Sequence, residues 1–156
     1  MNKILIIYFS KTGNTKKMAE KVAEGIKETG CEFILKSVEE TKVDDLLEVD
    51  GIIVGSPTYF GLPAAEIKKL FDESVVHFGK LEGKVGGAFT SSANIGGGNE
   101  TTILSILPLI PKEIMTKNRN LLLEWVLRAK ELERLAQEVD GLRELGAYII
   151  VKARKC

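Results

Sequence analysis

The chain has 156 residues, of which 22 are basic and 22 acidic, so its formal net charge at pH 7 is zero. This length suits a single domain with a substantial core, and we expect residues 1–156 to form one domain. The balanced charge argues against a nucleic-acid-binding protein, and no apolar stretch approaches the roughly 18 residues that would cross a membrane.

The first predicted elements are a buried strand and an amphipathic helix. Residues 4–9 are continuously apolar, which is typical of a parallel strand covered on both faces. Residues 14–28 place apolar side chains on one helical face, and Gly30 follows as a stop signal. A short second strand is predicted over residues 33–35, and a weak helical turn over residues 43–49.

The middle of the chain continues the alternation of strand and helix. Residues 51–55 predict a third, continuously apolar strand. Residues 64–78 predict a helix whose apolar face includes Val75, and residues 85–91 predict a fourth strand. Strands that alternate with helices through short connections are typical of a doubly wound parallel α/β sheet.

The last third of the chain has a different pattern. Pro108 and Pro111 break the helix predicted to begin near Asn99. A long helix with one apolar stripe is predicted over residues 120–145, and a fifth strand of open direction over residues 147–152. We expect this region to form much of the contact in a homo-oligomer, because the stripe exceeds what one domain face needs. The alternative is that the helix covers the sheet of its own chain.

Three unusual loops follow the first, third and fourth predicted strands. The carboxyl ends of parallel strands share one edge of the sheet, and ligands of open α/β sheets bind there. The residues of these loops are therefore the candidate cofactor-binding residues: Ser10, Lys11, Thr12, Gly13, Asn14 and Thr15 in the first loop, Pro57, Thr58, Tyr59, Phe60 and Gly61 in the second, and Ser91, Ser92, Ala93, Asn94, Gly96 and Gly97 in the third.

The first loop has the composition of a phosphate site. Ser10, Thr12, Asn14 and Thr15 surround the start of a predicted helix with hydroxyl and amide groups. A helix N-terminus offers unpaired N–H groups and a partial charge of roughly +0.5, which attract a phosphate. Gly13 allows close approach or a positive φ. An ordinary capped turn needs only one such side chain, so the pattern favours a phosphate site.

The other two loops suit a flat ring. Tyr59 and Phe60 offer planar apolar surface between Pro57 and Pro63. The glycine-rich residues 91–99 can place backbone N–H groups against a planar polar edge. Each loop alone could be an ordinary surface turn or a flexible connection. Together, the three loops predict a ligand with a phosphate at one end and a heteroaromatic ring at the other.

At these loops the chain resembles the flavodoxin-like proteins. Residues 10–15 match their phosphate-loop pattern (Ser/Thr)-x-Thr-Gly-x-Thr. Residues 55–61, and residues 89–92 followed by 96–102, are similar to segments of the WrbA-type NAD(P)H:quinone oxidoreductase branch. The resemblance covers residues 3–107, with three separate motifs in the same order.

The resemblance implies a three-layer flavodoxin-like fold with strand order 2-1-3-4-5 and noncovalently bound FMN. It further implies two-electron reduction of quinone-like acceptors by NAD(P)H. Residues 10–15 would hold the FMN phosphate, and residues 57–61 and 91–97 would flank the isoalloxazine. The chemistry of such a protein belongs to the flavin, so we expect no catalytic side chain.

Beyond residue 107 the chain departs from the family pattern. The family has a fifth strand, a loop with Gly, Asp and Tyr, and a final helix, whereas here prolines and a long predicted helix precede the last strand. Two alternatives therefore stay open: a one-electron carrier that docks on redox partner proteins, and a non-catalytic flavin-binding module. The balanced charge and the lack of acidic residues from 51 to 65 disfavour the carrier.

Other polar residues are assigned no chemistry. The single histidine, His77, is interpreted as a surface residue, and Asp44 and Asp45 as part of a solvated helix face. Cys31 is expected to pack at a strand start, and neither it nor Cys156 has metal-site spacing. Without a disulfide framework or a cleavable signal pattern, the expected location is the cytoplasm.

Overall fold

A five-stranded sheet forms the centre of the computed structural model, which describes residues 3–81, 83–94 and 96–110 and the backbone of residues 147–152. The strands lie in the order β2-β1-β3-β4-β5, which confirms the expected order. β5 runs antiparallel to β4, whereas the other pairs are parallel. The strand bounds are β1 (Lys3–Tyr8), β2 (Glu32–Ser37), β3 (Gly51–Pro57), β4 (Val85–Ser91) and β5 (Ala147–Lys152).

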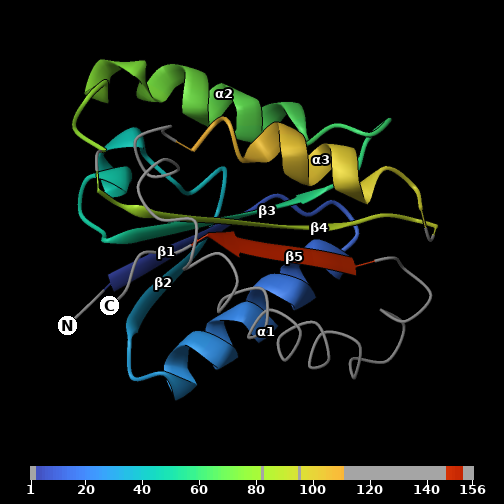
Figure 1. The fold of residues 1–156 in the computed structure, drawn as a ribbon, viewed down its shortest axis with the longest axis horizontal. Helices are drawn as coiled ribbons and strands as arrows, with labels where there is room; N and C mark the ends of the chain where they lie inside the picture. Colours follow the sequence, from blue (N-terminus) through green and yellow to red (C-terminus); the bar gives the residue numbers. More distant parts are fainter. Residues whose placement is uncertain (1–2, 82, 95, 111–146, 153–156) are drawn as a thin grey trace.

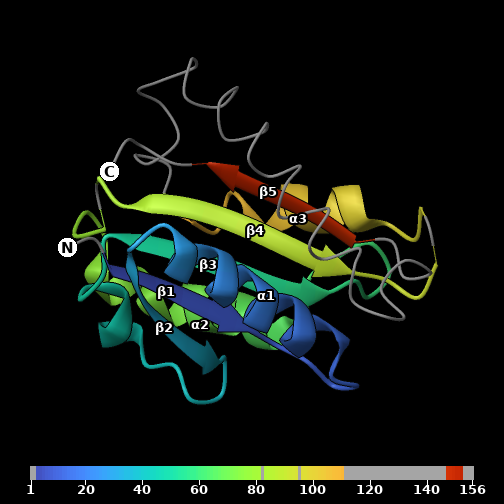
Figure 2. The same ribbon diagram turned by 90° about the horizontal axis from the view of Figure 1, so that it is seen from below.

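Helices cover both faces of the sheet, as the doubly wound interpretation requires. In Figure 1, α2 and α3 lie above the strands and α1 lies below them. Figure 2 shows the same layers from below, with α1 on the near side of the sheet and α2 on the far side. The fold is therefore the predicted three-layer, flavodoxin-like α/β fold. The bounds are α1 (Asn14–Glu28), α2 (Ala65–Glu73) and α3 (Asn99–Ile106), with 3-10 turns η1 (Val43–Leu46) and η2 (Ser74–His77).

The core has one part on each face of the sheet. Leu5, Ile52 and Ile67 belong to the cluster beneath α2 and α3, while Ile6 and Met18 belong to the cluster beneath α1. All five side chains are completely buried. Neighbouring residues of β1 thus point to opposite faces, which explains why a parallel strand with two covered faces is continuously apolar. Cys31 packs against the α1 side, as expected.

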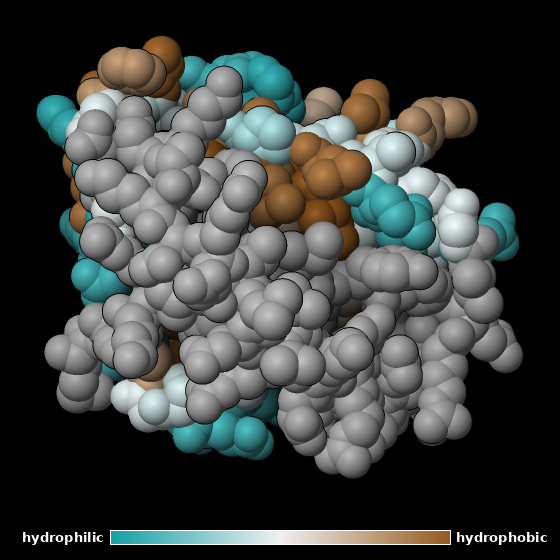
Figure 3. Space-filling model, viewed as in Figure 1, coloured by the Kyte–Doolittle hydropathy of each residue, from teal (hydrophilic) through white to brown (hydrophobic). Residues whose placement is uncertain are grey.

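The predicted helix over residues 64–78 is too long at its C-terminal end. α2 ends at Glu73, and the Ser74 hydroxyl donates to the carbonyl of Phe71 at 2.7 Å, a local bond that competes with helix continuation. The chain then continues as η2, and the expectation that Val75 points inward is wrong, since 67% of it is exposed. Figure 3 shows separate apolar patches in the upper part of this view, where α2 and α3 lie, with hydrophilic residues between them.

The predictions of a long helix over residues 120–145 and of the position of Cys156 concern residues outside the described part of the structure. The homo-oligomer proposed from that helix is therefore a prediction that these elements do not test. The fifth strand predicted over residues 147–152 matches β5 in its bounds.

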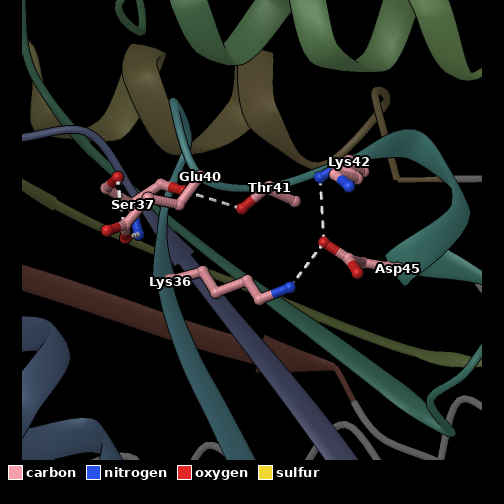
Figure 4. A network of polar contacts seen from close by, with 6 residues as sticks. All are labelled: Lys36, Ser37, Glu40, Thr41, Lys42 and Asp45. Carbon is pink, nitrogen blue, oxygen red and sulfur yellow. Dashed lines mark hydrogen bonds and ion pairs between the residues drawn. The ribbon is translucent and has the colours of Figure 1, made fainter.

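Polar contacts join η1 to β2 and η2 and leave Asp45 partly buried, whereas the Asp44 side chain is 76% exposed, as expected. Asp45 accepts bonds from Lys36 Nζ and from the Lys42 N–H, both at 2.8 Å (Figure 4). Burial alone would raise the pKa of the Asp45 carboxyl, but these two hydrogen bonds and the nearby lysine charges outweigh it and lower the pKa. Asp44 pairs with His77 Nε2 at 2.8 Å. Because the His77 side chain is only 11% exposed, its interpretation as a surface residue is wrong.

The Lys84 ammonium binds the segment that follows η1. It donates to the Leu47 carbonyl at 2.9 Å and also to the Val49 carbonyl, so it joins β4 to the segment between η1 and β3. Burial lowers the pKa of this lysine, and the nearby Asp50 charge partly offsets the effect.

The depressed pKa of Asp45 predicts an acid-sensitive contribution to stability. A carboxylate with a lowered folded-state pKa stabilises the fold above its unfolded pKa, and this contribution is lost as the pH falls through the folded pKa. We expect Asp45→Asn to lower the unfolding free energy by on the order of 1 kcal/mol near neutral pH, since the pair is only partly buried. The difference from the wild type should shrink as the pH falls below the ordinary carboxyl pKa and through the lowered pKa of Asp45.

Urea unfolding at neutral and acidic pH measures this difference. Asp72→Asn is the matched control, because Asp72 also pairs with a lysine, Lys68, but on the exposed face of α2. The loss of unfolding free energy in Asp72→Asn should be close to zero at both pH values. A difference between wild type and Asp45→Asn that does not change with pH would contradict the prediction.

Candidate functional site

The three loops meet at the edge of the sheet where β1, β3 and β4 end. Parallel pairing aligns Tyr8 with Gly55, and Pro57 with Ser91, so the chain leaves these strands side by side. In Figure 1 this edge is on the right. The structure thus brings together the first loop (residues 10–15), the second loop (residues 56–63) and the third loop (residues 91–99), as the sequence predicts.

The first loop presents the start of α1 without a cap. Gly13 precedes the helix with φ of 91°, and its N–H donates to Ser10 Oγ at 3.1 Å. None of the described side chains caps α1, and its first turn has no acidic residue. Lys11 and Thr12 are exposed at the rim, and Asn14 is half-buried. The N–H groups of this turn and the helix dipole therefore favour an anion here.

Three lysines add positive charge beside the first loop. Lys11, Lys16 and Lys17 are exposed, and none of them forms an ion pair with a described residue. By contrast, Lys21, one turn further along α1, pairs with Glu24 at 2.6 Å. The unpaired charges raise the local concentration of anionic ligands, an effect that added salt weakens.

Thr15 takes a position that sequence reasoning missed. It is 2% exposed, and its Oγ1 lies 3.0 Å from Ser91 Oγ at the end of β4. The predicted role of this hydroxyl as a phosphate contact stays untested, but its observed contact joins the first loop to the third. No local signal reveals this pair, because its members lie 76 residues apart in the chain.

The second loop is a closed turn with an aromatic tip. Tyr59 and Leu62 exchange two backbone hydrogen bonds of 2.9 and 3.0 Å. The tip residues Phe60 and Gly61 have φ of 52° and 79°, and the Phe60 side chain is fully exposed. Tyr59 is 40% exposed and meets Phe9 edge-on, with ring centroids 6.5 Å apart. Phe60 therefore has a free ring face, whereas Tyr59 is partly backed by the protein.

The third loop keeps its backbone near the surface. Ser92 Oγ donates to the Asn94 carbonyl at 2.6 Å, and the Gly97 N–H donates to the same carbonyl at 3.1 Å. Ala93, Asn94, Gly96 and Gly97 are exposed. A loop of this kind can offer backbone N–H groups to the polar edge of a ring.

Behind the second and third loops lie three fully buried polar residues that the sequence interpretation did not select: Thr90, Asn99 and Thr102. A polar residue at the end of an apolar strand or in the first turn of a helix has common structural explanations. Their common contact with Thr58 becomes visible only in three dimensions.

The described part of the chain has neither clustered candidate metal ligands nor a helix that could cross a membrane. No group of three His, Cys, Asp or Glu residues lies there in an arrangement that could hold a metal ion. No helix among the same residues has the length and apolar character needed to span a membrane.

Sequence comparison places the three loops in a known context. The flavodoxin family model matches residues 6–102. A flavodoxin from Aquifex aeolicus is 47% identical over 112 residues, covering 70% of this chain and 60% of that protein. An NAD(P)H dehydrogenase (quinone) from Caulobacter vibrioides is 40% identical over 129 residues, covering 69% and 65%. The chain thus spans less than two thirds of the length of these curated relatives.

Solved structures share the fold. The flavodoxin, WrbA-like protein from Agrobacterium tumefaciens superposes with a TM-score of 0.62 and 30% identity, covering 72% of this chain and 74% of that one. A flavodoxin from the domain Archaea gives a TM-score of 0.65 with 28% identity, covering 88% and 95%. The family match includes all three loops (residues 10–15, 56–63 and 91–99), and the chain therefore belongs to the flavodoxin family.

Proposed function

We propose that the chain binds FMN at the three loops and works as a flavoprotein oxidoreductase. The observation that carries the proposal is the state of the N-terminus of α1. None of the described side chains caps it, and its first turn contains no acidic residue that would repel an anion. A dianionic phosphate suits this position. The adjoining aromatic and glycine-rich loops suit the ring of the same ligand, and membership of the flavodoxin family supports the choice of a flavin.

Each loop has a distinct part in this proposal. Ser10, Thr12 and Asn14 bind the phosphate, together with the N–H groups at the start of α1. Phe60 and Tyr59 cover the isoalloxazine, and the third loop provides backbone N–H groups for its polar edge. Bound FMN supplies the hydride and electron transfer, while the chain binds it, orients it and adjusts its reduction potential.

For the reaction, we propose two-electron, NAD(P)H-dependent reduction of quinone-like acceptors. The quinone dehydrogenase from Caulobacter vibrioides, at 40% identity, supports this choice. The lysines beside the first loop and the lack of acidic residues from 51 to 65 also disfavour docking on a basic redox partner. The alternative, an electron carrier for redox partner proteins, is supported by the 47% identity to the flavodoxin of Aquifex aeolicus. The cytoplasmic location and the homo-oligomer stay predictions.

A visible spectrum followed by a turnover assay tests the proposal. The protein, purified with added FMN and freed of excess ligand, is expected to show flavin absorption. It should then oxidise NADH or NADPH only when a soluble benzoquinone is present. A protein that retains no flavin would contradict the flavoprotein assignment. Flavin absorption without turnover would favour the carrier or the non-catalytic module.

The exposed aromatic tip leads to a prediction for the second loop. We expect Phe60→Ala to lower FMN affinity about 2- to 10-fold, because an aromatic contact contributes about 0.5–1.5 kcal/mol beyond area burial. Tyr59→Ala should have a smaller effect, since Phe9 already covers part of its ring. Flavin fluorescence quenching during titration measures both losses.

Val76→Ala is the control for this pair, because Val76 is also exposed and apolar but lies in η2, beyond the far end of α2. It should leave the affinity unchanged. If Phe60→Ala and Tyr59→Ala both leave quenching and affinity as in the wild type, the second loop does not cover the ring.

A further inference from the structure

A cluster of four polar side chains connects the second loop with β4 and α3. We call Thr58, Thr90, Asn99 and Thr102 the hydroxyl cluster. Thr58 Oγ1 lies 3.0 Å from Thr90 Oγ1 and 3.0 Å from Thr102 Oγ1, and it donates to Asn99 Oδ1 at 3.2 Å. Thr90, Asn99 and Thr102 are fully buried. Thr58 is thus held by partners from both elements that flank the third loop.

The hydroxyl cluster also holds the backbone of both loops. Thr90 Oγ1 donates to the Ser56 carbonyl at 2.7 Å, and Thr102 Oγ1 lies 2.9 Å from the Gly98 carbonyl. Ser56 in turn accepts a bond from the Ala64 N–H at 2.8 Å, at the far end of the second loop. The same group of buried side chains therefore contacts both ends of the second loop and the last glycine of the third loop.

Direct contacts between the loops make this arrangement tighter. The Thr58 N–H donates to the Ser91 carbonyl at 2.8 Å. A Cβ on Gly98 would lie only 2.8 Å from Gly61 Cα, so the two backbones touch. The contact between Thr15 and Ser91 connects the first loop to the third loop. A site whose backbone groups are fixed before binding has less ordering cost when its ligand arrives.

We propose that Thr90, Asn99 and Thr102 are positioning residues, which hold the second and third loops against the flavin ring through Thr58. They lie behind the loops and act on the ring by fixing the backbone that faces it. This inference rests on the proposed function. Its competitor is that the four side chains only satisfy one another and stabilise the fold, as buried polar groups generally do.

Paired substitutions of Thr90 separate the two explanations. Thr90→Val removes the hydroxyl at nearly constant volume, and Thr90→Ser keeps it. We expect Thr90→Val to weaken binding of FMN and of riboflavin by the same factor, about 5- to 30-fold, because both ligands share the ring and the buried hydrogen bonds of Thr90 to Thr58 and Ser56 are lost. Thr90→Ser should restore most of the affinity. A change at the phosphate would instead affect FMN alone.

The flavin reduction potential provides a second readout, which a purely stabilising role would not move. If Thr90→Val weakens the binding of oxidised and of reduced flavin by different factors, the two-electron midpoint potential of the bound flavin shifts. The shift is about 30 mV for each tenfold difference between the two factors. Thr102→Val and Thr102→Ser repeat the test with the Thr90 bond to Ser56 intact, and they decide the matter if Thr90→Val does not fold.

Ser74→Ala is the matched control for loss of a buried hydroxyl. Ser74 is 8% exposed, and it donates to the Phe71 carbonyl at the end of α2, away from the loops. It should lower stability without changing affinity or potential. Valine variants that fold and bind both ligands with wild-type affinity and potential would overturn the positioning role. A wild-type protein that binds neither ligand would instead overturn the proposed function.

Discussion

Thr12→Ala is expected to lower FMN affinity about 10- to 150-fold and to leave riboflavin affinity unchanged. The Thr12 side chain is exposed at the rim of the first loop, where it can reach a phosphate at the start of α1. Loss of a charge-assisted hydrogen bond costs about 1.5–3 kcal/mol, which corresponds to this range of affinity. Riboflavin lacks the phosphate, so the same substitution removes nothing from its binding.

Calorimetric titration of wild type and variant with both ligands measures the effect. Thr29→Ala is the matched control, because Thr29 caps the other end of α1 by donating to the Ile26 carbonyl at 2.7 Å. It should change neither affinity. Added salt should weaken FMN binding more than riboflavin binding, since three lysines that form no ion pair with a described residue lie beside the first loop. Equal wild-type affinities for FMN and riboflavin would rule out a phosphate site here.

Much of the fold is predictable from local patterns. α1 and β4 have the predicted bounds, because an amphipathic stripe and a continuously apolar run are signals carried by the segment itself. The parallel order of the strands then brings the three loops to one edge, so the location of the candidate site also follows from the sequence.

Contacts between distant segments are the part that could not be predicted. Asp45 accepts a hydrogen bond from Lys36, and His77 contacts Asp44, which is 33 residues away in the chain. Val75 follows the end of α2 at Ser74, where a local side-chain bond changes the helical geometry. The outcomes at Asp45 and His77 depend on which segment packs alongside, whereas the outcome at Val75 depends on a local bond, and hydrophobic periodicity holds no information about either.

The same reason explains why the three loops can be predicted from the sequence, whereas the hydroxyl cluster behind them cannot. The hydroxyl and glycine content of the first loop is visible in six consecutive residues. By contrast, Thr58 meets Thr90 across 32 residues and Thr102 across 44. The pairing depends on the register of β3 with β4, which places Pro57 opposite Ser91. A single residue of slippage would separate these side chains.

Gly98→Ala is expected to have the largest effect of any single substitution in the third loop. Gly98 has φ of 96°, where a side chain costs about 1–2 kcal/mol, and its added Cβ would lie 2.8 Å from Gly61 Cα. The obstacle is backbone, which cannot turn away as a flexible side chain could. Overpacking of this kind adds about 1–3 kcal/mol. We therefore expect the free energy of unfolding to fall by about 2–5 kcal/mol.

Gly30→Ala separates the steric contribution from the conformational one. Gly30 also has a positive φ, 77°, but no atom lies within 4 Å of its added Cβ, so it should lose only about 1–2 kcal/mol in urea unfolding. Because Gly98→Ala must displace Gly61, it should also move the second loop and weaken FMN binding, whereas Gly30→Ala, beyond the far end of α1, should not. Equal stability losses in the two variants would show that the second and third loops are not in close contact. Unequal losses with unchanged FMN affinity would show that their contact does not shape the flavin site.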